Sequence, residues 1–179
     1  MSVDLILGPM FSGKTTTLLS YEKKFQITKK KYICINHSFD NRYTTDGKLA
    51  THDGTISKGS NLSVSSLKSI EPFILDEFDA FIIDEVQFFD DIYIFVSYWS
   101  SQGKIIVCAG LSSDYKLEPF DNISKLIPKC DHILHLTALC VDCGNPAPFT
   151  ERSIKSEEQT LIGTDDIYKP KCRKCHRII

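Results

Sequence analysis

Residues 8–15, Gly-Pro-Met-Phe-Ser-Gly-Lys-Thr, match the phosphate-binding loop pattern Gly-x-x-x-x-Gly-Lys-[Ser/Thr]. The apolar run at 3–7 predicts a buried strand before the loop, and residues 14–25 predict a helix after it. In that context glycines let backbone N–H groups turn toward phosphate oxygens, and the helix N-terminus adds its positive dipole end. An ordinary glycine-rich turn is the alternative, and the flanking elements argue against it. The pattern predicts a nucleoside triphosphate site made of Gly8, Pro9, Met10, Phe11, Ser12, Gly13, Lys14 and Thr15.

Two carboxylates follow the apolar run at 80–83 and suggest how such a site would do chemistry. Lys14 would reach the outer phosphates, and the Thr15 hydroxyl would bind Mg²⁺. Asp84 stands where phosphate-loop enzymes place their second magnesium-associated carboxylate. Glu85 would leave the strand in another direction, so it can take a proton from the attacking group while Asp84 serves the metal. An acidic strand end facing solvent is the alternative interpretation.

Two Cys-x-x-Cys pairs near the C-terminus predict a metal site. Four thiolates at this kind of spacing are typical of zinc, and a site with no open position is structural rather than catalytic. Unligated surface thiols or a redox pair are the alternatives. His176 adjoins the second pair and could compete as a ligand, although four cysteines already satisfy zinc. The predicted ligands are Cys140, Cys143, Cys172 and Cys175.

Composition narrows the class of protein. The chain has 179 residues, 42% of them hydrophobic, and a net charge of −2, which gives no general attraction to nucleic acid or to acidic membranes. No stretch approaches the ~18 continuous apolar residues of a membrane span, and the N-terminus runs straight into the phosphate loop. Seven cysteines is an odd number, and three lie in or beside apolar segments, so a disulfide framework is not expected. We therefore expect a cytoplasmic protein without nucleic-acid or membrane partners.

These residues need a scaffold of alternating strands and helices. Such alternation predicts an α/β fold of the phosphate-loop type, with a mostly parallel sheet and helices on both faces. Ligands bind such sheets at the carboxyl ends of the strands, where both the loop and Asp84 fall. We predict an ATP-binding domain at 1–136 and a small zinc-ribbon-like lobe at 137–179. Besides 3–7 and 80–83, strands are expected at 31–36, 104–111 and 132–136, helices at 14–25, 67–75, 88–101 and 123–127, and a long loop at 37–60.

Several motifs together resemble one family. Residues 8–15, Asp-Asn-Arg-Tyr at 40–43, Thr-His-Asp at 51–53, Asp-Glu-Val-Gln-Phe-Phe at 84–89 and the cysteine pairs look like thymidine kinases of the cytosolic and viral type. The resemblance runs from Val3 to Cys175 in the family's order. It implies transfer of the ATP γ-phosphate to the 5′-hydroxyl of thymidine, giving thymidine monophosphate. It further implies Mg²⁺, structural zinc, a homotetramer and feedback inhibition by thymidine triphosphate.

The resemblance also implies roles for individual residues. Glu85 resembles the family's catalytic base, and Asp40 and Arg42 match a pair that approaches the phosphates and the metal from the long loop. Gln87 matches a residue of the cofactor site. Residues 159–163 resemble the lasso segment whose backbone bonds the thymine edge, anchored at both ends by the zinc. The nucleoside pocket would be lined by Met10, Phe88, Leu111, Tyr115, Phe120, Thr150, Gln159, Leu161, Gly163 and Tyr168.

The sequence departs from the family pattern at two places. Where the family has Leu-Asp-Gly-Thr-Phe or similar, residues 111–115 read Leu-Ser-Ser-Asp-Tyr, so an acidic residue has moved. The paired glycines of the lasso are replaced by Gly163-Thr164. Both changes lie on the nucleoside side, and one methyl group discriminates by only about 1–3 kcal/mol. A broader deoxynucleoside kinase that also accepts deoxyuridine and analogues therefore stays open.

Two further functions compete with phosphate transfer to a nucleoside. A nucleic-acid-dependent ATPase could use Asp84 and Glu85 as a hydrolytic pair, but the chain lacks a basic stripe. A zinc-ribbon interaction module could use its ATP site only as a switch, but this gives no reason for the aromatic positions or the lasso.

Overall fold

The computed structural model describes residues 1–39, 48–51, 54–155, 158–161, 163 and 166–177. Its centre is a six-stranded sheet in the order β3-β2-β4-β5-β1-β6, in which every pairing is parallel. This confirms the predicted fold class. The strands are β1 (Ser2–Leu7), β2 (Tyr32–His37), β3 (Ser60–Val64), β4 (Ala80–Ile83), β5 (Ile105–Gly110) and β6 (His132–His135).

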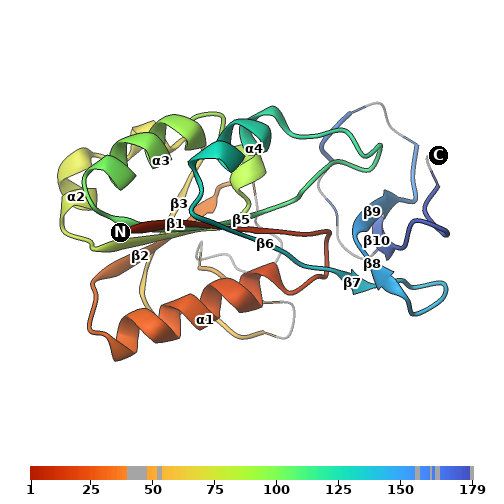
Figure 1. Cartoon of the computed structure of the whole chain (residues 1–179), viewed down its shortest axis with the longest axis horizontal. Helices are drawn as coiled ribbons and strands as arrows, with labels where there is room; N and C mark the ends of the chain where they lie inside the picture. The colour runs from red at the N-terminus through yellow and green to blue at the C-terminus, as the bar shows by residue number, and fades with distance from the viewer. Residues whose placement is uncertain (40–47, 52–53, 156–157, 162, 164–165, 178–179) are drawn as a thin grey trace.

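Helices cover both faces of the sheet (Figure 1). Helix α1 (Lys14–Ile27) lies on one face, where Leu18 and Phe25 pack on strand residues such as Ile82. The other face carries α2 (Pro72–Asp76), α3 (Ile92–Ser101) and α4 (Asp121–Leu126). On that face the ring centroids of Phe81 and Trp99 lie 5.4 Å apart. Because the central strands are buried on both faces, they read as continuous apolar runs.

Three expectations about secondary structure need correction. Strand β3, which was not predicted, begins at Ser60, the last residue of the loop expected at 37–60; it is a partly exposed edge strand of sequence Ser-Asn-Leu-Ser-Val and lacks a continuous apolar run. The helix expected at 88–101 begins at Ile92, after a 3₁₀ turn at Val86–Phe88. The helix expected at 67–75 is a 3₁₀ turn, Leu67–Ser69, followed by α2, which starts at Pro72 because proline is tolerated only in the first helical turn.

Beyond the carboxyl ends of β1 and β6, two small antiparallel sheets follow (Figure 1). Strand β7 (Ala138–Leu139) pairs with β8 (Pro146–Ala147), and β9 (Phe149–Arg152) pairs with β10 (Tyr168–Lys171). These strands carry the cysteine pairs at their ends. The domain boundary at 136/137 stays a prediction.

Among the described residues, no helix combines the length and the apolar character that a membrane crossing requires.

Candidate functional site

The phosphate loop connects β1 to α1 and has the expected backbone. Gly13 has φ 82°, a left-handed conformation that glycine adopts without strain. A Cβ atom at Gly8 would lie 2.6 Å from the Ser12 hydroxyl oxygen and 2.9 Å from the Leu136 carbonyl oxygen, so no larger residue fits. The Lys14 ammonium is buried and donates to the Pro9 carbonyl at 2.8 Å. This hydrogen bond joins the two ends of the loop next to the N-terminus of α1.

Asp84 lies at the carboxyl end of β4 and faces this loop. The Thr15 hydroxyl donates to the Asp84 carboxylate at 2.9 Å, although the two residues are 69 positions apart. Burial raises the pKa of the Asp84 carboxyl to about 7, and the charge of Glu85 adds to the rise, while the Thr15 hydroxyl and Lys14 oppose it. A hydroxyl and a carboxylate beside a phosphate loop are the oxygen donors that Mg²⁺ prefers. The donor set therefore fits Mg²⁺.

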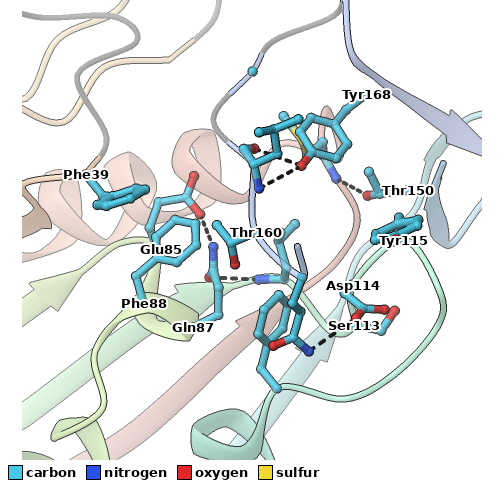
Figure 2. Close-up of a pocket in the computed structure, with 16 residues that line it drawn as sticks. Phe39, Glu85, Gln87, Phe88, Ser113, Asp114, Tyr115, Thr150, Thr160 and Tyr168 are labelled. Carbon is cyan, nitrogen blue, oxygen red and sulfur yellow. Dashed lines mark hydrogen bonds between the residues drawn. The ribbon is translucent and has the colours of Figure 1, made fainter. Parts of the chain in front are cut away.

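Glu85 points away from Asp84 because of its backbone. Its φ of 52° is in the left-handed region, which is uncommon for a residue with a long side chain. The chain thereby leaves β4 and enters the 3₁₀ turn at Val86–Phe88. The two neighbouring carboxylates then face different partners. Asp84 bonds to Thr15 of the phosphate loop, and Glu85 lines the adjoining pocket (Figure 2). Such strain is typical of functional positions.

Gln87 fixes the orientation of Glu85. Its side-chain oxygen accepts the Leu111 backbone N–H at 3.1 Å, so its amide nitrogen must face the other way. That nitrogen donates to the Glu85 carboxylate at 2.5 Å (Figure 2). The glutamine is buried, and a Cβ atom at Gly110 would lie 2.8 Å from its side-chain oxygen. The structure places Gln87 behind Glu85, and its expected contact with the nucleotide stays a prediction.

A pocket opens next to Glu85, and its empty space, including the part open to solvent, measures about 620 Å³. Its walls bring together segments from the whole chain, and aromatic rings face its interior (Figure 2). Every residue predicted for the nucleoside pocket lines it: Met10, Phe88, Leu111, Tyr115, Phe120, Thr150, Gln159, Leu161, Gly163 and Tyr168. Asp40 and Arg42 lie outside the described residues. Sequence reasoning missed the lining residues Phe39, Ser113 and Asp114, whereas Thr160, which also lines the pocket, falls within the predicted lasso segment.

Strands β9 and β10 supply one wall of the pocket. The Met10 backbone N–H donates to the Thr150 hydroxyl at 3.0 Å, which links the phosphate loop to β9. The Tyr168 hydroxyl donates to the Leu161 carbonyl at 2.8 Å and accepts the Leu161 N–H at 3.3 Å. These bonds hold residues 158–161, which we call the covering segment, against the pocket.

The four predicted cysteine ligands form one cluster. Their sulfur atoms all lie within 4.8 Å of one another, with Cys143 3.6 Å from Cys172 and 3.7 Å from Cys175. Zn–S bonds of about 2.3 Å put the corners of a tetrahedron about 3.8 Å apart, so the cluster fits zinc. Backbone N–H groups, that of Cys172 first, lower the pKa of Cys140 to about 6, whereas the neighbouring thiols, that of Cys172 first, raise the pKa of Cys175. His176 instead packs edge-on against the Phe149 ring, 5.6 Å between centroids.

Comparison with known proteins gives a consistent result. The family described as "Thymidine kinase" matches residues 1–176. A thymidine kinase of Choristoneura fumiferana entomopoxvirus is 39% identical over an alignment of 183 positions, covering 98% of this chain and 96% of that protein. A thymidine kinase of monkeypox virus is 40% identical over 174, covering 97% and 96%, and one of vaccinia virus strain Ankara is 39% identical with the same coverage. The match covers the phosphate loop, the carboxylate pair, the aromatic pocket and the cysteine cluster, and this chain therefore belongs to the thymidine kinase family.

Proposed function

We propose that this protein transfers the γ-phosphate of ATP to the 5′-hydroxyl of thymidine. The observation that carries the proposal is the position of Glu85. Its side chain lines the pocket, while its neighbour Asp84 is bonded to Thr15 of the phosphate loop. A carboxylate at the boundary between a triphosphate site and an aromatic pocket suits proton transfer from an alcohol that enters through the pocket.

In this mechanism Glu85 accepts the proton of the 5′-hydroxyl as the hydroxyl oxygen attacks the γ-phosphorus. The P–O bond to the β-phosphate breaks, and ADP leaves with the electron pair. Lys14 and the loop N–H groups hold the phosphates, and positioning of this kind supplies most of the catalysis in phosphoryl transfer. Mg²⁺, held by Thr15 and Asp84, would neutralise charge on the outer phosphates. Gln87 keeps the Glu85 carboxylate aimed at the pocket. From the long loop, Asp40 and Arg42 would add to the phosphate site.

The nucleoside would occupy the pocket with its base among the aromatic side chains. Phe88, Tyr115 and Phe120 line the cavity, and planar rings stack well on a pyrimidine. Met10, Leu111 and Thr150 would surround the base and its methyl group. The covering segment would present backbone groups to the thymine edge, as in the family.

The cysteine cluster would hold a structural zinc. Cys140 and Cys143 precede β9, and Cys172 and Cys175 follow β10, so the metal would join the two ends of the chain that covers the pocket. Four thiolates leave no open coordination position, which argues against a catalytic role.

The direct test is ADP release measured with each deoxynucleoside in turn, with ATP and Mg²⁺ present. We expect thymidine to give the highest kcat/KM. Deoxyuridine, which lacks the 5-methyl group, should follow about 10- to 200-fold lower, because one methyl contributes about 1–3 kcal/mol. Equal rates with all pyrimidine deoxynucleosides would favour the broader kinase. ATP turnover that single-stranded DNA stimulates and thymidine does not would overturn the proposal.

We also propose a homotetramer, as the family resemblance implies, and the edge of the sheet supports self-association. Strand β6 is one of the two edge strands of the sheet, and its side chains Ile133 and Leu134 remain nearly half exposed. Exposed apolar edge strands in native proteins are commonly covered by another chain. Light scattering after gel filtration should give a mass near four chains, and Leu134→Lys should reduce it, whereas Ile127→Lys on the 3₁₀ turn after α4 should not. A wild-type monomer at micromolar concentration would contradict this proposal.

We also propose feedback inhibition by thymidine triphosphate and a cytoplasmic location. The nucleoside end of the inhibitor would fill the pocket while its phosphates reach the adjoining phosphate loop. Inhibition should then be competitive with both substrates.

The free thiols of Cys34 and Cys108 are buried, which suits a reducing compartment and supports the proposed cytoplasmic location.

A further inference from the structure

Asp114 is a buried carboxylate on the loop after β5, where this chain departs from the family pattern. One of its oxygens accepts two backbone N–H groups of its own loop, from Lys116 at 2.8 Å and Glu118 at 2.9 Å. The other accepts the side-chain amide of Gln159 at 3.2 Å (Figure 2). The carboxylate is therefore fixed by its loop and aimed at the covering segment.

A second contact joins the same two segments. The Arg152 guanidinium lies 3.6 Å above the centre of the Tyr115 ring, and it donates to the Glu158 carbonyl at 2.8 Å. Arg152 and Tyr115 are both buried, so the stack is shielded from water, while the hydrogen bond to Glu158 is partly buried. Asp114 thus contacts Gln159 directly, and Tyr115 is linked through Arg152 to Glu158. Two consecutive residues after β5 are therefore joined to two consecutive residues of the covering segment.

We propose that Asp114 is a positioning residue that fastens the covering segment to the loop after β5 and so sets the affinity for the nucleoside. The inference rests on the proposed function. Asp114, Tyr115, Gln159 and Leu161 all line the same pocket, so the contacts that join them also shape the surface that a nucleoside meets. If the covering segment is already ordered in the free protein, less of the binding free energy is lost in ordering it when the nucleoside binds.

The residue types at positions 114 and 159 decide which side chain donates this hydrogen bond and which accepts it. A carboxylate at 114 accepts hydrogen bonds, and glutamine at 159 can donate one. Reversing the two groups, with a donor at 114 and an acceptor at 159, would preserve the bond. Two carboxylates would repel each other.

The experiment is therefore a charge swap in the full-length protein. Gln159→Glu should raise the KM for thymidine by about threefold to tenfold, because a hydrogen bond worth about 1 kcal/mol is replaced by repulsion. The double variant Asp114→Asn with Gln159→Glu should recover most of that loss, since the amide introduced at position 114 can keep its oxygen on the loop and donate to residue 159. Gln159 is exposed, so the single substitution does not threaten the core. The KM for ATP should stay unchanged in both variants.

Glu118→Gln is the matched control, because it removes an exposed carboxylate from the same loop. It should leave the KM for thymidine unchanged. Hydrogen exchange of residues 158–161 without nucleoside gives a second readout, which should be faster in Gln159→Glu and restored in the double variant. A double variant no better than Gln159→Glu alone would overturn the inference. Wild-type protein that does not phosphorylate thymidine would overturn the proposed function instead, and the exchange experiment would still decide the attachment.

Discussion

Glu85→Gln is expected to lower kcat by about 10²- to 10⁴-fold, the usual contribution of a positioned general base. The substitution keeps the shape of the side chain, and its amide oxygen can still accept the Gln87 hydrogen bond. It replaces the basic carboxylate with a neutral amide, whose oxygen is too weakly basic to take the proton of the 5′-hydroxyl. The KM values for ATP and thymidine should change little, because the phosphate loop and the pocket walls stay intact. Single-turnover kinetics and binding isotherms for both substrates measure these effects separately.

Asp84→Asn provides the informative comparison for that prediction. Asp84 lies beside Glu85 but faces Thr15, so its loss should act mainly through the Mg²⁺ concentration that gives half-maximal rate. Glu77→Gln, an exposed carboxylate after α2, should change neither quantity. Turnover of Glu85→Gln within a few-fold of wild type would remove Glu85 from the base role.

The features that could be predicted from the sequence are those whose chemistry requires particular residue types at a fixed spacing along the chain. The phosphate loop requires its glycines and lysine in one short run, and the strand before Asp84 is uniformly apolar because it is buried on both faces. The four thiols were predictable for the same reason, since zinc ligation tolerates few alternatives. Parallel pairing then follows, because strands joined by helices must cross over.

The parts that sequence did not reveal depend on contacts between distant residues. Strand β3 is stabilised by β2 rather than by its own weak propensity. The aim of Glu85 comes from Gln87, whose side chain is oriented by a backbone N–H on another strand's loop. The partner of Asp114 lies 45 positions away, and no spacing rule links the two. Such contacts appear only when the fold is assembled.

Loss of the cysteine cluster should affect the two substrates unequally. In Cys172→Ser we expect the KM for thymidine to rise at least tenfold, because β10 and the covering segment lose the point that anchors their C-terminal end. The affinity for ATP should fall by at most about tenfold. The hydrogen bond from Met10 to Thr150 links the phosphate loop to β9, and such a bond contributes about 1 kcal/mol. Zinc content by atomic emission and separate binding isotherms check both expectations.

Cys130→Ser is the matched control, since its thiol lies outside the cluster and donates to the Leu126 carbonyl at 3.3 Å, a bond that serine can keep. It should retain zinc and both affinities. Chelation of the wild-type metal should reproduce the Cys172→Ser result, and added zinc should reverse it in the wild type but not in the variant. The asymmetry follows from the fold, because the parallel sheet and α1 build the triphosphate site from their own core, whereas the small antiparallel sheets have little buried apolar surface. Equal loss of ATP and thymidine binding would mean that the cluster stabilises the whole chain, and its proposed role at the pocket would then be wrong.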